Sequence, residues 1–101
     1  MKTYNGFYDL LQAMPELPNA GWVFVNKNIS IQSESAIREA LFYIAESELE
    51  EIEFEKSKRT FVECPTLEDV ISILDKRPEQ PSAEDYLKGV LYYREYDDFQ
   101  E

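Results

Sequence analysis

Residues 60–74, with the sequence TFVECPTLEDVISIL, combine a strand pattern with a helix pattern. Thr60, Phe61 and Val62 are β-branched or aromatic, which is typical of a buried strand. From Leu67 onward, apolar residues recur three and four positions apart, the spacing of one face of a helix. Thr66, three residues before an Asp, resembles a helix N-terminus, although the full capping box has a longer Glu or Gln there. A strand that leads directly into a helix predicts a mixed fold.

Two further segments have the pattern of helices. Residues 82–85, SAED, repeat the start signal, and Tyr86, Val90 and Tyr93 then share one face of a last helix. Near the N-terminus another stripe has helical spacing and consists of Phe7, Leu10, Leu11 and Met14. For this first helix we expect a start capped by Thr3 or Asn5 and an end at Pro15 and Pro18.

Strand patterns fill much of the remaining chain. Residues 22–25, WVFV, predict a buried strand, and Ile29 and Ile31 alternate with polar neighbours as an edge or hairpin partner would. In residues 50–55 Ile52 and Phe54 alternate with glutamates, which indicates a half-exposed strand. With a polar turn at 56–59, residues 50–64 then form a hairpin. Residues 34–51 contain a helical stripe, but Leu41–Ile44 also has the pattern of a buried strand, and the periodicity leaves both open.

Together these patterns predict one acidic α+β domain over residues 1–101. We expect a sheet of about four mostly antiparallel strands, with an N-terminal helix and two C-terminal helices packed on it. A chain of 101 residues has the size of a single domain, and dividing it would leave neither half with a core.

Charge is the strongest global property of the sequence. Asp and Glu number 21 against 10 Lys and Arg, giving a net charge of −11. Such a surface repels phosphates and anionic lipids, so we expect neither direct nucleic-acid binding nor membrane binding. It suits a basic protein partner, whose encounter it would steer. The first residues lack the apolar segment of a signal peptide, and the single cysteine gives no sign of an oxidising compartment, so we expect a cytoplasmic protein.

The residues needed for most enzyme chemistry are missing. There is no histidine, and three scattered glycines cannot form a phosphate-binding loop. Cys64 therefore has no histidine base, and we expect a buried, unreactive thiol. A pair of carboxylates could act alone, but such chemistry needs a sizeable substrate cleft. We therefore expect no enzyme, no cofactor and no metal, and a protein that acts by binding.

Two segments are candidates for partner binding. The first is a block of glutamates that either forms a solvated strand face or recognises a Lys- and Arg-rich surface: Glu46, Glu48, Glu50, Glu51, Glu53 and Glu55. The second is C-terminal and mixes aromatic with acidic residues, which suits an interface but also a tail folded back on the sheet: Tyr92, Tyr96, Asp97, Asp98 and Phe99.

The two ends of the chain also resemble a known family. The opening MKTYNGFYDLL (1–11) and the closing segments 65–71, 82–88 and 91–99 are similar to small bacterial immunity proteins of polymorphic toxin systems, including contact-dependent growth inhibition. The resemblance implies a sheet with packed helices, in which Leu41–Ile44 is a strand. It also implies that the protein binds the C-terminal domain of a cognate toxin and blocks its active site. Many such toxins are nucleases with basic clefts, which an acidic protein complements.

The sequence thus leads us to expect an immunity protein that neutralises a cognate toxin, with Glu51, Glu53 and Tyr96 as the first residues to test. Two alternatives stay open. One is an acidic, phage-type inhibitor or nucleic-acid mimic directed at a host enzyme, and the other is an adaptor protein of unknown pathway.

Overall fold

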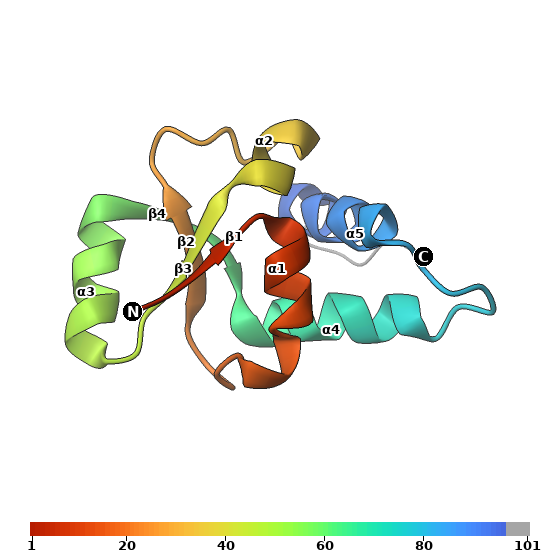
Figure 1. The fold of residues 1–101 in the computed structure, drawn as a ribbon, viewed down its shortest axis with the longest axis horizontal. Coiled ribbons are helices and arrows are strands. Elements are labelled where there is room, and N and C mark those ends of the chain that lie inside the picture. The colour runs from red at the N-terminus through yellow and green to blue at the C-terminus, as the bar shows by residue number, and fades with distance from the viewer. Residues whose placement is uncertain (97–101) are drawn as a thin grey trace.

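The computed structural model describes residues 1–96 and shows an α+β domain (Figure 1). The domain consists of a four-stranded antiparallel sheet with helices packed on both of its faces. The elements in chain order are β1 (Lys2–Asn5), α1 (Phe7–Gln12), the 3-10 turn η1 (Met14–Glu16), β2 (Trp22–Asn26), α2 (Glu34–Glu39), β3 (Leu41–Ile44), α3 (Glu48–Ser57), β4 (Lys58–Glu63), α4 (Cys64–Asp75) and α5 (Ala83–Tyr96).

The strand order is β1-β3-β2-β4, so β1 and β4 form the two edges of the sheet. Val23 pairs with both Ile44 of β3 and Val62 of β4. The register between β2 and β4 shifts after Val23, and the next pair is Phe24 with Thr60. Phe61 is therefore the extra residue of a β-bulge, which lets the consecutive Phe61 and Val62 both be buried.

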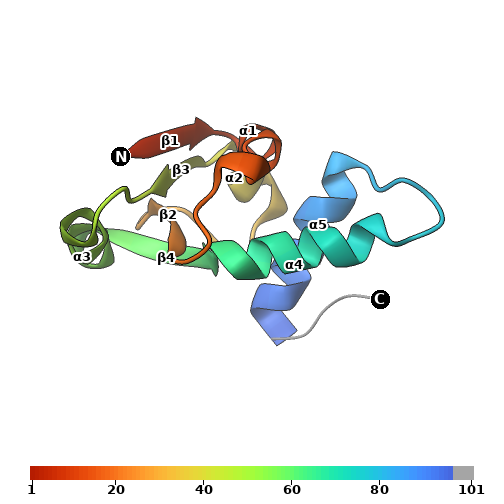
Figure 2. The same ribbon diagram turned by 90° about the horizontal axis from the view of Figure 1, so that it is seen from below.

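The main core lies on one face of the sheet, under α1, α2, α4 and α5. Figures 1 and 2 show these helices gathered on one side, away from α3. Its members are apolar side chains from strands and helices alike, and those without exposed area include Phe7, Leu10, Val23, Val25, Ile37, Phe42, Leu67, Leu87 and Val90. Burial of such side chains from water is the main source of stability in a domain of this size.

A smaller aromatic cluster lies on the other face, under α3. Phe54 of α3 packs edge-on against Phe24, with ring centroids 5.5 Å apart, and against Tyr43 at 6.1 Å. Phe24 and Tyr43 pair across β2 and β3, so they point to the same side of the sheet. The ammonium group of Lys58 lies 4.0 Å from the centre of the Tyr43 ring. Phe54 therefore anchors α3 to the sheet.

The predicted strand at 50–55, and with it the hairpin at 50–64, is wrong. Residues 48–57 form α3, and β4 pairs with β2 instead. Ser47 caps this helix by accepting a hydrogen bond from the Glu50 N–H at 3.2 Å. Glutamate and leucine are good helix formers, and two apolar residues spaced by two did not outweigh that preference.

Two expectations at the N-terminal side also fail. Ile29 and Ile31 do not form the expected edge or hairpin strand, but lie in the loop after β2 and pack partly against the core. The edge of the sheet beside β3 is formed by β1 instead. Thr3 and Asn5 belong to that strand, so neither caps α1. The N-cap is Gly6, whose φ of 96° suits glycine at the sharp turn from strand to helix.

Other expectations are confirmed. Residues 22–25 lie in β2, and Leu41–Ile44 is the strand β3, as the resemblance implied. The helical pattern that precedes it forms α2. Ser82 starts α5 as predicted, because its backbone N–H donates to the Asp85 carboxylate at 2.9 Å and its hydroxyl accepts from the Asp85 N–H at 3.2 Å. The predicted start of α4 at Thr66 is wrong by two residues, because the helix begins at Cys64 after the N-cap Glu63, with Pro65 in its first turn.

Candidate protein-binding surface

Helix α3 presents an apolar strip to solvent. Successive residues of a helix are 100° apart, so Leu49 and Ile52 lie on the side opposite Phe54. Leu49 is 80% exposed and Ile52 51% exposed, whereas Phe54 is 6% exposed. Glu48 and Glu53 are exposed on either side of the strip. We call Glu48, Leu49, Ile52 and Glu53 the α3 surface.

The glutamate block divides by exposure. Glu46, Glu48, Glu53 and Glu55 are exposed, whereas Glu50 and Glu51 are half-buried. Glu50 faces the sheet end, where it accepts hydrogen bonds from the Glu46 N–H at 2.9 Å and from the amino group of Met1 at 3.0 Å. These two contacts, the backbone one first, lower the pKa of its carboxyl. Glu50 thus stabilises the fold locally.

Glu51 lies beside the turn that precedes β2. One of its carboxylate oxygens would be 3.4 Å from a Cβ at Gly21, a glycine with a φ of 98°. The predicted pair Glu51 and Glu53 therefore points in different directions. Glu53 belongs to the α3 surface, and Glu51 does not.

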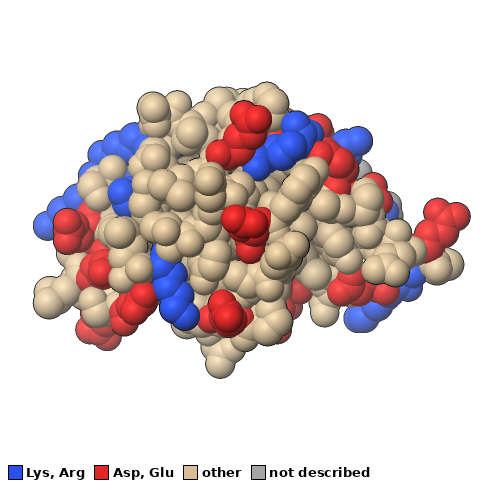
Figure 3. Space-filling model, viewed as in Figure 1, with Lys and Arg blue, Asp and Glu red and all other residues tan. Residues whose placement is uncertain are grey.

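Basic residues border the acidic ones. Lys56 lies at the C-terminal end of α3, and Lys58 and Arg59 begin β4. In Figure 3 acidic side chains gather over the lower part of α3 at the left of the view, and basic side chains gather above them. On this face of the molecule the acidic side chains over α3 therefore form a compact patch.

The two described C-terminal candidates form a separate surface. Tyr92 and Tyr96 lie one turn apart on α5, with ring centroids 4.6 Å apart, and Tyr96 is 60% exposed. Tyr86 and Tyr93 pack on the core as predicted, together with the buried Val90. Asp97, Asp98 and Phe99 lie outside the described residues. The molecule is 42 Å long, and Figures 1 and 2 show α3 at one end of it and α5 beyond the sheet.

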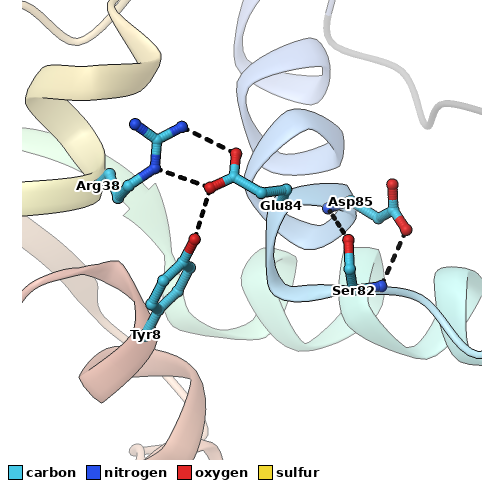
Figure 4. Close-up of polar contacts among 5 residues, drawn as sticks. All are labelled: Tyr8, Arg38, Ser82, Glu84 and Asp85. Carbon is cyan, nitrogen blue, oxygen red and sulfur yellow. Dashed lines mark hydrogen bonds and ion pairs between the residues drawn. The ribbon is translucent and has the colours of Figure 1, made fainter.

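A polar cluster that the sequence did not reveal joins α1, α2 and α5 (Figure 4). The Arg38 guanidinium donates to both carboxylate oxygens of Glu84 at 2.8 Å, and the Tyr8 hydroxyl donates to one of them. Arg38 first, and then Tyr8, lower the pKa of Glu84 to about 2, while the same contact with Glu84 raises the pKa of Tyr8. Glu84 stays ionised and Tyr8 protonated at neutral pH, so neither is poised for proton transfer. The cluster fastens three helices together.

Groups suited to chemistry are sparse in the described chain. Within residues 1–96 no group of three or more Cys, Asp or Glu side chains could hold a metal ion. Burial raises the pKa of the Cys64 thiol to about 11, so thiolate is scarce at neutral pH. No described helix has the length and apolarity needed to cross a membrane.

The exposed strip of α3 also escaped prediction, although a signal was present. Ser47 and Glu50 have the S-x-x-E spacing of a capping box just before the segment. A helix beginning there places Leu49 and Ile52 opposite Phe54. The alternating pattern had placed Ile52 and Phe54 on one buried side.

Comparison of the chain with protein-family models, with curated proteins and with solved structures found no match. The α3 surface brings exposed aliphatic and acidic side chains together on a helix that Phe54 anchors from behind.

Proposed function

We propose that this protein is an immunity protein that binds a cognate toxin domain and neutralises it through the α3 surface. The observation that carries the proposal is the exposed pair Leu49 and Ile52, flanked by glutamates on a helix that Phe54 fixes to the sheet. Exposure of two large aliphatic side chains to water is unfavourable, and a bound partner would remove that cost.

The composition of the α3 surface supports a protein partner. Specific interfaces have an apolar centre surrounded by a polar rim, and a few central side chains carry most of the binding energy. Leu49 and Ile52 would form such a centre, and Glu48 and Glu53 its rim. Because α3 is already ordered, little conformational entropy would be lost on binding.

The charge supports a basic partner. The net charge of −11 would accelerate association with a cationic surface, and the rim glutamates would pair with its Lys and Arg side chains. A nuclease must hold the phosphates of its substrate in a cationic site. Carboxylates inserted there occupy the positions of phosphates and exclude the substrate. Such an immunity protein acts in the cytoplasm, where an imported toxin meets its target.

The compact shape of the acidic patch favours this proposal over a nucleic-acid mimic. A mimic needs carboxylates spaced along an elongated face, as phosphates are along a strand. Here the basic residues Lys56, Lys58 and Arg59 follow the acidic ones at the C-terminal end of α3 and limit the acidic surface there.

The direct test is a growth assay. Cells would express the toxin domain encoded immediately upstream of this gene, with and without this protein. We expect rescue from toxicity and co-purification of the two proteins. The double variant Leu49→Ser/Ile52→Ser should fold, because both side chains are exposed, and should lose rescue. The variant Tyr92→Ser/Tyr96→Ser, which removes two exposed aromatic side chains from α5, should keep it. Rescue that survives the first variant and fails with the second would move the interface to α5.

A further inference from the structure

The outer edge of β4 is an open strand edge. β4 pairs with β2 on one side, and within residues 1–96 no strand pairs with it on the other. Figure 2 shows β4 at the side of the sheet opposite β1, with the C-terminal part of α5 extending past it. An edge of this kind offers unpaired backbone donors and acceptors to another chain.

A groove follows this edge. It consists of two adjoining hollows of about 460 and 240 Å³ that share Trp22, Thr60 and Arg94. Val25 pairs with Arg59, and Asn26 with Lys58, so Lys58 and Arg59 point to opposite sides of the sheet while both line the larger hollow. The groove therefore straddles the strand edge, with β4 as its floor.

Positive charge collects in this groove, although the protein as a whole is strongly acidic. The Arg94 Nε donates to the backbone carbonyl of Phe61 at the bulge, and its guanidinium lies 5.5 Å from the Phe61 ring. Arg59 donates to the carbonyl of Ile29 at 3.4 Å. Both partners are neutral carbonyls, and within residues 1–96 neither arginine forms an ion pair.

The two arginines also repel each other. Burial first, and then the nearby charge of Arg59, lower the pKa of the Arg94 guanidinium. Arg94 is half-buried and Arg59 is exposed, and the two like charges line one hollow, so their mutual repulsion has a cost that water screens only in part. An anionic group between them would relieve this cost and could accept hydrogen bonds from both.

We propose that the β4 groove binds an extended acidic segment of a protein partner, which adds to the sheet as a strand beside β4. A carboxylate of the segment lies between Arg59 and Arg94, and the apolar side chain of an adjacent residue, on the opposite face of the added strand, packs on Trp22. This surface is separate from the α3 surface and opposite to it in charge, so it holds whether or not the toxin is the partner of α3.

A peptide fits this groove better than a nucleic acid. The strand edge supplies hydrogen bonds that match a peptide backbone, and a phosphate chain has no donors to return. A nucleic acid would also carry many charges toward a protein of net charge −11, and Glu55 and Glu63 line the same groove. One carboxylate at the arginine pair involves far less repulsion.

The test uses a random library of twelve-residue displayed peptides selected against the purified full chain. We expect the selected peptides to be enriched in Asp or Glu next to apolar residues. Arg59→Glu should weaken their binding by at least about tenfold, because it reverses a charge that contacts the carboxylate. Lys2→Glu makes the same charge change on β1, the other edge of the sheet, and should leave binding intact. Methylation of alternate backbone nitrogens of a selected peptide should abolish binding if the peptide adds as a strand, a test that needs no protein variant.

Several results would overturn the proposal. The selection could yield no acidic peptides, the Arg59→Glu variant could bind the selected peptides as tightly as the wild type does, or methylation of the peptide backbone could leave binding unchanged. Binding of a thymidine octanucleotide in preference to the selected peptides would assign the groove to nucleic acid instead. A dimer of the free chain that Arg59→Glu dissociates would show that a second copy covers β4.

Discussion

Replacement of Phe54 by alanine, compared with the same replacement at Ile52, tests whether residues 48–57 form a helix. Phe54 is 6% exposed and packs between Phe24 and Tyr43, so its removal leaves a cavity under α3. Buried Phe→Ala substitutions cost about 3–5 kcal/mol, and we expect the lower end because α3 covers only the small cluster. A loss of about 3 kcal/mol corresponds to a fall in Tm of roughly 12–24 °C for a domain of this size.

Ile52→Ala should cost less than about 1 kcal/mol, because the side chain is half exposed and alanine has the higher helix propensity. Urea unfolding, followed by the fluorescence of the single tryptophan and by circular dichroism, measures both free energies. Leu49→Ala, at a position of the same helix that is 80% exposed, serves as the control. Equal losses at positions 52 and 54 would refute the helix, since an alternating strand buries both on one side.

Three further predictions concern other contacts. Gly89→Ala should lower the free energy of unfolding in urea by about 1 kcal/mol, because the new Cβ would lie 2.9 Å from Leu74 Cδ1 and this overpacking outweighs the helix propensity gained. A stabilised variant would contradict the close packing of α4 and α5. The pKa of Glu84 is lowered from 4.5 to about 2, so its ion pair stabilises the fold fully above pH 4.5 and this stabilisation is lost toward pH 2. In thermal melts Glu84→Gln should therefore be less stable than the wild type at pH 7, and the difference should vanish near pH 2. A difference in Tm that does not change with pH would disprove this linkage. Cys64 should react with a thiol reagent such as DTNB only when the protein unfolds, because the thiol is buried and its pKa is raised to about 11. Rapid labelling of the folded protein would contradict this burial.

Much of the fold was predictable where local chemistry decides the structure. The start of α5 follows from Ser82 and Asp85, which cap the helix through contacts three residues apart. Strand β2 follows from a short run of β-branched and aromatic residues between turn residues. Such signals need no knowledge of the rest of the chain.

The elements that were missed depend on distant partners or on competing local signals. Lys2–Asn5 is mostly polar and becomes a strand only because it pairs with β3, about forty residues away in the chain. In residues 48–57 the alternation of Ile52 and Phe54 competed with helix propensity and a serine cap, and the helix prevailed.

The candidate surface was predictable only in part. The glutamates stand out in the sequence, but their division into exposed and half-buried positions follows from the direction of α3. The Tyr8–Arg38–Glu84 cluster joins residues up to 76 positions apart, and the β4 groove brings Arg59 beside Arg94. No local pattern encodes these proximities.

The most direct test of the central claim is the affinity of the purified protein for the toxin domain identified by the growth assay. Titration calorimetry would compare the wild type with Glu48→Lys/Glu53→Lys on the α3 surface. The control is Glu68→Lys/Asp69→Lys, which makes the same change of net charge at exposed positions of α4. We predict that the α3 variant binds the toxin domain at least about tenfold more weakly than the wild type does. The affinity of the control should fall only slightly, because its reduced net charge acts at long range. Equal affinities of the two variants would contradict the assignment of the binding site to α3.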